Sequence, residues 1–134
     1  MLNMFNLDGK VAMVTGGNVG IGNALAMGLA KAGADLFIFT YNDDNMENVI
    51  KEVEALGRKV AYVTGDLSKE EVAMEAVSKC IEAFGRVDIL VNNAGTIKRS
   101  PILEGPNSDW QQVIDLNLSS IYYLFPFSSL SCRW

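Results

Sequence analysis

The chain has 134 residues, of which 49% are hydrophobic and 20% charged, a composition typical of one globular domain. Lys and Arg number 11 against 16 Asp and Glu, giving a formal net charge of −5 without the basic stripe that binding of a nucleic-acid backbone needs. Histidine is absent, which excludes Ser-His-Asp and Cys-His catalysis and any histidine-ligated metal. We therefore expect neither a nucleic-acid partner nor a metal site.

Cysteine usage and hydropathy indicate the compartment. Cys80 and Cys132 lie far apart with no C-x-x-C spacing, so neither a disulfide framework nor a zinc site is expected. The segment from Met1 to Lys10 has no long apolar core, and no apolar run approaches the roughly 20 residues of a membrane-spanning helix. The sequence thus predicts a cytoplasmic protein without membrane contact.

Short apolar runs alternate with amphipathic stretches along the whole chain. In chain order the pattern predicts a strand at Val11–Thr15, a helix at Ile21–Ala32, a strand at Leu36–Thr40, a helix at Asn45–Leu56, a strand at Lys59–Thr64, a helix from Ser68 to Phe84, a strand at Val87–Asn92 and a last helix opened by Ser108. Gly33, Gly57 and Gly85 follow the first three helices. Ser68 and Ser108 each begin a capping-box pattern, and Pro126 is expected to interrupt the last helix.

Strands that alternate with helices imply right-handed crossovers and a parallel sheet. We find no linker, repeat or charge block, so residues 1–134 are expected to form one α/β domain. The strand near residue 87 is the last one expected, which leaves Ile89–Val91 as an apolar edge. Because such an edge is a template for pairing, we expect a homo-oligomer.

A glycine-rich segment joins the first strand to the first helix. Gly16, Gly20 and Gly22 give the spacing G-x-x-x-G-x-G. Glycines at a strand-to-helix turn let the backbone approach a diphosphate, and the helix N-terminus supplies free N–H groups. A tight turn that serves packing alone is the alternative. The context favours a dinucleotide-binding, Rossmann-like doubly wound sheet that ends after its fourth strand and the following helix.

Three further features follow the strands. Asp66 and Leu67 end the third strand, where a carboxylate or its neighbouring backbone can read an adenine edge; an ordinary loop aspartate is the alternative. The run Asn92–Gly95 ends the fourth strand and can brace the sheet beside a ribose, or form a plain turn. Asn117 lies inside the last helix, where asparagine is not favoured by local helix propensity. Without the other motifs, it would be interpreted as a solvated surface residue.

Together these motifs resemble the short-chain dehydrogenase/reductase family from about Leu7 to Leu124. The resemblance rests on Thr15–Gly22, Asp66, Asn92–Gly95 and Asn117, in that order. It implies that Asn117 is the helix asparagine of a catalytic tetrad and supports a proton-relay water. The resemblance also implies a set of cofactor neighbours, to which we add adjacent residues at the ends of the same strands. The full set is Gly16, Asn18, Gly20, Ile21, Gly22, Thr40, Tyr41, Asp66, Leu67, Asn93, Ala94 and Gly95.

The segment from Asn92 to Glu104 is most similar to the family's sugar-acid branch, that of 2-deoxy-D-gluconate 3-dehydrogenases and gluconate 5-dehydrogenases. This similarity implies hydride transfer between a nicotinamide cofactor and a secondary alcohol or ketone of a small sugar acid. Lys98 and Arg99 are then candidates to meet the substrate carboxylate. A solvated basic pair is the alternative.

The end of the second strand indicates which dinucleotide is bound. Thr40 and Tyr41 stand where an acid for the ribose 2′-hydroxyl of NAD is sought, and Asp43 and Asp44 follow. Between residues 16 and 50 the only cation is Lys31, so nothing nearby suits the 2′-phosphate of NADP. The sequence therefore favours NAD over NADP.

The family's Ser and Tyr-x-x-x-Lys are missing from this sequence. Residues four places after Tyr41, Tyr62, Tyr122 and Tyr123 are Asn45, Asp66, Pro126 and Phe127, none of which is lysine. Residues 125–134 form a tail unlike the family. We therefore expect a truncated chain that is inactive alone but can still hold an ADP-like group. The alternative is a non-catalytic adenine-nucleotide-binding or interaction module; a P-loop phosphotransferase is disfavoured because no Gly-Lys-Ser/Thr follows the glycines.

Overall fold

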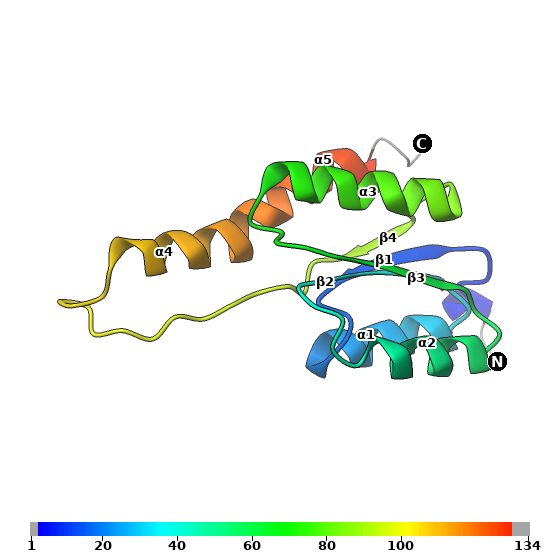
Figure 1. Cartoon of the computed structure of the whole chain (residues 1–134). Coiled ribbons are helices and arrows are strands. Elements are labelled where there is room, and N and C mark those ends of the chain that lie inside the picture. The colour runs from blue at the N-terminus through cyan, green and yellow to red at the C-terminus, as the bar shows by residue number, and fades with distance from the viewer. Residues whose placement is uncertain (1–2, 130–134) are drawn as a thin grey trace.

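The computed structural model describes the backbone of residues 3–129 and the side chains of residues 4–125. After a short 3-10 turn at Asn3–Phe5, strands and helices alternate along the chain (Figure 1). They are β1 (Val11–Thr15), α1 (Gly20–Lys31), β2 (Asp35–Thr40), α2 (Met46–Ala55), β3 (Val60–Thr64), α3 (Glu70–Phe84), β4 (Ile89–Val91), α4 (Asn107–Ile114), a π-helical turn (Asp115–Ser119) and α5 (Ser120–Ser129).

The four strands form one parallel sheet in the order β3-β2-β1-β4. Parallel neighbours require crossover connections, and here α1 and α2 cover one face of the sheet while α3 and α5 cover the other (Figure 1). This arrangement confirms the Rossmann-like α/β fold that the sequence predicts. The order brings the ends of β1, β2 and β4 together, because β1 lies between the other two.

Side chains from β1 and β2 alternate between two apolar layers. Val11 and Met13 belong to the cluster that packs under α3 and α5, whereas Ala12 and Val14 belong to the cluster that packs under α1 and α2. All five residues of β1 are buried. A strand buried on both faces reads as a continuous apolar run, which is why this element is predictable from sequence.

The fourth strand is shorter than the sequence predicts. The expected strand covers Val87–Asn92, but β4 pairs with β1 only from Ile89 to Val91. Before it, the Asp88 carboxylate accepts a hydrogen bond from Val11 N–H at 2.9 Å; after it, Asn93 N–H turns to the Thr15 hydroxyl at 3.1 Å. Among the residues that the structure describes, β4 is the last strand of the sheet on the side of β1, as expected.

Both predicted capping boxes are wrong. Ser68 lies before α3, which begins at Glu70, and its hydroxyl donates to Asp66 Oδ1 at 2.7 Å instead of capping the helix. The local hydrogen bond wins because Asp66 is two residues away and charged. Helix α4 begins at Asn107, one residue before Ser108, after an extended Pro106 with no side-chain cap.

The predicted interruption at Pro126 is also wrong, since α5 continues to Ser129. Proline withdraws one backbone donor, which leaves the Tyr122 carbonyl without its helical partner. Tyr122 is 72% exposed, so water can reach this region of the helix and lessen the cost. Of the unusual tail, residues 130–134 lie outside the described part of the chain.

Candidate functional site

The turn from β1 into α1 brings two stretches of backbone into close contact. Gly16 has φ +66°, and a Cβ atom added there would lie 3.0 Å from the Asn93 side-chain nitrogen. A Cβ atom on Gly22 would collide with the Gly16 carbonyl oxygen and the Asn93 amide. Only glycine fits Gly22 without displacing the loop. The glycine loop is therefore packed closely against the side chain of Asn93.

The N-terminus of α1 is open at this turn. Its N-cap, Val19, makes no side-chain capping bond, and no acidic residue occupies the first helical turn. The first N–H groups of a helix lack intrahelical partners, and the helix dipole makes this end positive. The turn therefore combines open donors, positive potential and several glycines that carry no Cβ atom, which together suit a phosphate group.

Thr15 ties the ends of β1 and β4 together beside this turn. Its Oγ1 accepts hydrogen bonds from Asn93 N–H at 3.1 Å and Ala94 N–H at 2.9 Å, and donates to Val91 O at 3.4 Å. Asn93 Nδ2 also donates to Gly16 O at 3.2 Å. The asparagine segment thus braces the ends of β1 and β4 together with Thr15, which the sequence did not single out for this role.

Asn18 links the glycine loop to the loop after β2. Its Nδ2 donates to Asp44 O at 3.0 Å, and its own carbonyl accepts from Asn45 Nδ2 at 2.8 Å. Asn45 adopts a left-handed backbone conformation with φ +63°, which asparagine tolerates better than most residues. The two loops therefore hold each other in place.

Thr40 and Tyr41 occupy different environments although they are adjacent. Thr40 is buried, and its hydroxyl donates to the Asn42 carbonyl oxygen. Tyr41 is 79% exposed. Thr40 therefore shapes the loop after β2, while Tyr41 presents its ring at the surface.

Asp66 is held as a carboxylate at the end of β3. Its Oδ1 accepts from the Ser68 hydroxyl at 2.7 Å and from Ser68 N–H at 3.0 Å. The Ser68 hydroxyl is the largest cause that lowers the pKa of Asp66 below its usual value, ahead of a smaller contribution from Lys69 and against an opposing effect of burial. A fixed negative group therefore stands at this rim.

Asn117 lies on the π-helical turn and has a defined partner. Its Oδ1 accepts from Thr96 N–H at 2.8 Å, and its Nδ2 donates to Thr96 O at 2.9 Å. Asn117 is exposed, as the surface alternative expects, but its side chain is held in place by the backbone of Thr96. Because the partner lies 21 residues away in the chain, the sequence carries no trace of this pairing.

A cleft of about 980 Å³ opens where these segments meet. Of the predicted site residues, those that line it are Gly16, Asn18, Ile21, Gly22, Thr40, Tyr41, Asp66, Leu67, Asn93, Ala94 and Gly95. Gly20, which opens α1, does not line it, and Asn117 contributes only through Thr96. The lining residues that the sequence analysis did not name as site residues include Val19, Asn42, Asp44, Ser68, Lys69, Thr96, Gln112, Asp115 and Leu116.

Comparison with known proteins gives the lineage. The family model described as "short chain dehydrogenase" matches residues 10–126, most of the chain. The chain belongs to the short-chain dehydrogenase family. The resemblance stated from the motifs is thereby confirmed.

Relatives within the short-chain dehydrogenase family include a sugar-acid enzyme. The 2-dehydro-3-deoxy-D-gluconate 5-dehydrogenase of Dickeya dadantii is 41% identical over 124 residues, which are 92% of this chain and 48% of that protein. A Burkholderia cenocepacia short-chain dehydrogenase, solved in complex with NADP, superposes with a TM-score of 0.90 at 33% identity over 94% of this chain and 52% of that one. NAD+-bound xylitol dehydrogenase superposes with a TM-score of 0.85 at 28% sequence identity, over 93% of this chain and 48% of that one. The chain thus spans about half the length of the relatives it matches.

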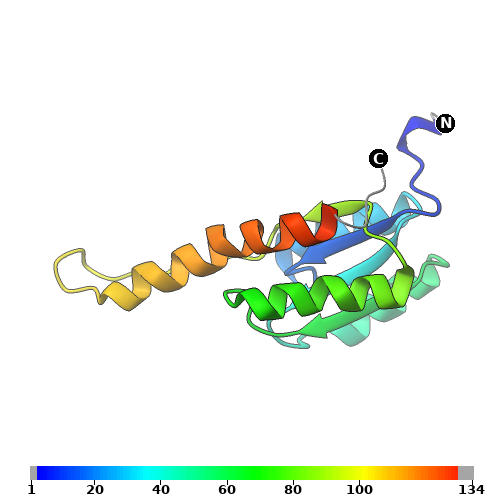
Figure 2. The ribbon, with the colours of Figure 1, turned by 90° about the horizontal axis from the view of Figure 1, so that it is seen from above.

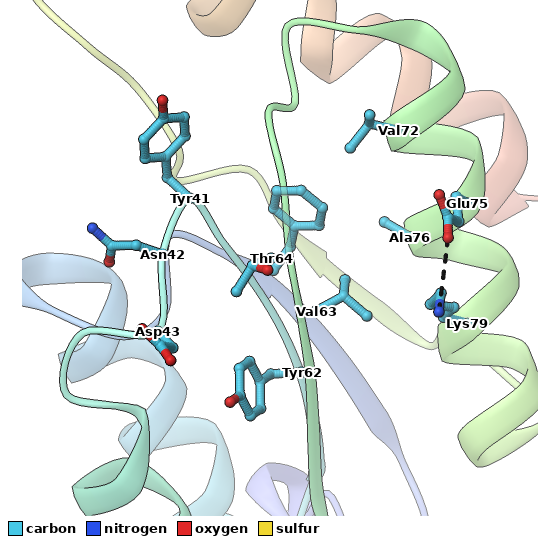
Figure 3. Close-up of a pocket in the computed structure, with 11 residues that line it drawn as sticks. Tyr41, Asn42, Asp43, Tyr62, Val63, Thr64, Val72, Glu75, Ala76 and Lys79 are labelled. Carbon is cyan, nitrogen blue, oxygen red and sulfur yellow. Dashed lines mark ion pairs between the residues drawn. The ribbon is translucent and has the colours of Figure 1, made fainter.

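A second hollow, of about 580 Å³, lies beside β3 and shares Tyr41 with the cleft. Figure 3 shows Tyr62 and Thr64 of β3 between the loop after β2 and helix α3, on which Lys79 pairs with Glu75 at 3.7 Å. Because it adjoins the cleft at Tyr41, this hollow extends the concave surface toward the β3 edge.

Two classes of site find no support in the described part of the chain. No three side chains among its Cys, Asp and Glu residues are grouped as metal ligands. None of its helices has the length and apolarity needed to span a bilayer.

Proposed function

We propose that this chain holds the adenosine diphosphate part of a nicotinamide dinucleotide in the 980 Å³ cleft. The observation that carries the proposal is the cradle formed by Gly16, Gly22 and Asn93 in front of the open N-terminus of α1. Because a Cβ atom at Gly22 would collide with Gly16 O and the Asn93 amide, glycine there allows the turn to pack closely beside the open helix N-terminus, an arrangement that suits a diphosphate. Asp66 and Leu67 lie at the rim that would receive the adenine.

NAD is the cofactor we favour. The loop after β2 contributes Asn42 and Asp44 to the cleft and no cation. The cations that line the cleft, Lys69 and Lys98, follow Asp66 and Gly95 instead. A 2′-phosphate would meet carboxylates rather than a basic side chain at this loop, which disfavours NADP.

For the lineage, we propose a dehydrogenase that transfers hydride between the nicotinamide and a secondary alcohol or ketone of a small sugar acid. The dehydro-deoxy-gluconate dehydrogenase of Dickeya dadantii supports this substrate class. Lys98 lines the cleft and is a candidate to pair with a substrate carboxylate. The bound dinucleotide would supply the hydride acceptor.

We propose that the chain alone does not complete this reaction. The sequence contains no Tyr-x-x-x-Lys pair to move the proton of the alcohol. Asn117 holds the backbone of Thr96 and so orders the cleft wall near the position expected for the nicotinamide. The proposal also places the chain in the cytoplasm, where the thiol of Cys80 stays reduced.

Titration calorimetry with NAD, NADP, ADP and AMP tests this function. We expect NAD and ADP to bind with similar, weak affinity and AMP to bind less well, because the diphosphate contacts the glycine turn. Gly22→Ala should abolish the heat of binding, whereas Gly28→Ala should leave it unchanged, since a Cβ atom there meets nothing within 4 Å. Stoichiometric NADH formation from a sugar acid would contradict the proposed lack of turnover.

The apolar edge at β4 favours a second candidate, a non-catalytic interaction module. Binding of no adenine nucleotide by a folded chain would support that candidate and overturn the first.

A further inference from the structure

The glycine turn between β1 and α1 is anchored to the sheet at its start. Gly16 N–H donates to Phe39 O of β2 at 2.7 Å, and Gly16 O accepts from Asn93 Nδ2 at 3.2 Å. A Cβ atom on Gly16 would lie 3.0 Å from the same Asn93 nitrogen, so this contact leaves little room for movement. The first residue of the turn is therefore held by the sheet and by the segment that follows β4.

The outer part of the turn is held from the other side, by the loop after β2. Asn18 O accepts from Asn45 Nδ2 at 2.8 Å, and Asn18 Nδ2 donates to Asp44 O at 3.0 Å. Asn23 Nδ2 also reaches Gly17 O, but at 3.4 Å, beyond the usual range of an N–H···O hydrogen bond. The pair Asn18 and Asn45, called here the asparagine interlock, therefore makes the shorter contacts to this part of the turn.

The interlock joins the N-terminal ends of two neighbouring helices. Asn18 lies just before the N-cap of α1, and Asn45 is the N-cap of α2. These helices contact each other on one face of the sheet, whereas α3 and α5 run side by side over the other, as Figure 2 shows from above. The interlock thus belongs entirely to the side of the fold that α1 and α2 cover.

Asn45 is suited to this contact by its backbone. It has φ +63°, the one positive φ of a residue other than glycine in the described part of the chain. Although it is the N-cap of α2, its side chain makes no capping bond to that helix. Its Oδ1 instead accepts from Asn48 Nδ2 at 3.0 Å, which directs its own Nδ2 toward Asn18 O. The amide of Asn45 therefore serves the glycine turn rather than its own helix.

Asn45 acts from outside the cleft. Asn18 and Asp44 line the 980 Å³ cleft, and Asn45 does not. Asn18 is only 5% exposed and its amide nitrogen donates to Asp44 O, so its side chain serves the interlock. Because a peptide unit is planar and trans, the bond that fixes Asn18 O also fixes the direction of Val19 N–H, at the N-cap of α1. The interlock therefore sets the backbone that leads into the open helix N-terminus.

We propose that Asn45 is a positioning residue for the diphosphate site and acts through Asn18 on the backbone of the glycine turn. This inference rests on the proposed binding of an adenosine diphosphate group. N–H donors that are already ordered bind an anion more tightly than donors that must be ordered on binding, because ordering a loop costs conformational entropy. A side chain outside the cleft thus determines how strongly the turn holds a diphosphate.

Titration calorimetry with ADP and AMP on two variants of Asn45 tests the proposal. Asn45→Gly keeps the left-handed backbone, which glycine adopts without strain, and removes the donor. Asn45→Asp keeps the shape of the side chain and an acceptor for Asn48, but a carboxylate oxygen then faces Asn18 O. We expect the dissociation constant of ADP to rise about 10-fold in Asn45→Gly, as for the loss of one hydrogen bond, and further in Asn45→Asp.

Asn48→Ala is the matched control. This variant removes an asparagine bond of similar length, 3.0 Å, from the exposed side of Asn45 and leaves the bond to Asn18 in place. The dissociation constant of ADP should stay within about 2-fold of the wild-type value, since water can replace an exposed donor. Far-UV circular dichroism checks that each variant is folded.

The ratio of ADP affinity to AMP affinity separates positioning from a general loss of stability. A loosened turn should lower this ratio, because ADP places more phosphate against the turn than AMP does, whereas partial unfolding weakens both equally. If Asn45 matters only for its left-handed backbone, Asn45→Gly binds ADP as tightly as the wild type, and the proposal is overturned. An equal loss in Asn48→Ala overturns it too. A folded wild-type chain that binds no ADP overturns the proposed function, and this inference with it.

Discussion

The side-chain amide of Asn117 is bound at both ends by the backbone of Thr96, with its oxygen 2.8 Å from Thr96 N and its nitrogen 2.9 Å from Thr96 O. This pair joins the π-helical turn to the start of the long loop that leads from β4 to α4 and extends away from the sheet (Figure 1). Further along, Glu104 N–H and Gly105 N–H bond to Pro101 O within the loop itself, so we expect the Asn117–Thr96 pair to order this wall of the cleft.

Asn117→Leu should loosen this loop. Loss of two hydrogen bonds, each worth about 1 kcal/mol net, should speed amide hydrogen exchange at Thr96 by about 10-fold or more. Mass-spectrometric exchange over residues 95–106 measures it. Gln112→Leu, an exposed side chain of α4, is the control. Unchanged exchange in Asn117→Leu would show that other contacts order the loop.

Thr15→Val should destabilise the fold without changing side-chain shape. The variant leaves Asn93 N–H and Ala94 N–H without their acceptor in a partly buried region. We expect the free energy of unfolding to fall by about 2 kcal/mol. Urea denaturation measures the change, and Thr64→Val, on the exposed side of β3, should stay within about 0.5 kcal/mol of the wild type.

Gly22→Ala and Gly28→Ala should have opposite effects on stability although both lie in α1. The alanine at position 22 would collide with Gly16 O, so the β1–α1 turn must shift and stability must fall. At position 28 the added methyl meets open space, and replacing a helix-interior glycine should raise stability by about 0.5–1 kcal/mol. Thermal unfolding of the two variants is the measurement; equal shifts would contradict the close backbone approach.

Asp66 should make the fold sensitive to acid. Ser68 holds the pKa of this carboxyl below its usual value of 3.8 in the folded state. The stabilisation is therefore complete above the unfolded-state pKa and is lost as the pH falls through the lower folded-state pKa. Asp66→Asn keeps an acceptor for Ser68 and should flatten the decline of unfolding free energy at acid pH. Glu104→Gln, an exposed control, should retain the wild-type slope.

Cys80 should resist thiol reagents while the protein is folded. Burial raises the pKa of its thiol to about 12, so almost no thiolate is present at neutral pH. In a Cys132→Ser background, labelling by a disulfide exchange reagent should be slow and should accelerate with urea in step with unfolding. Fast labelling without denaturant would show that α3 opens locally.

The sequence is sufficient to predict the elements whose cause is local. β1 and β2 are continuous apolar runs between glycine-rich or polar segments, and the glycine segment predicts the turn at which α1 begins. The glycine turn and the strand-end residues Asp66 and Asn93 were predictable for the same reason: in a parallel sheet the ends of neighbouring strands meet at one edge. Whether those residues bind a cofactor stays a prediction.

The helix starts were mispredicted because a capping pattern has competitors. Ser68 has a charged carboxylate two residues away, and its hydroxyl bonds there. Ser108 lies behind Pro106, whose extended backbone already starts the helix one residue earlier. The local sequence indicates which hydrogen-bond partners a serine hydroxyl has nearby, but the folded geometry decides which of them it binds.

The chain by itself determined an alternating α/β order and a glycine turn at the first crossover, because both follow from residue type and spacing. Tertiary structure decided that Thr15 bonds to the segment after β4, that Asn117 reaches back to Thr96, and that Gln112 and Asp115 border the cleft. The hydrogen bonds of Thr15 and Asn117 join residues 78 and 21 positions apart, and distance along a chain carries no information on hydrogen-bond geometry until the sheet brings its strands together.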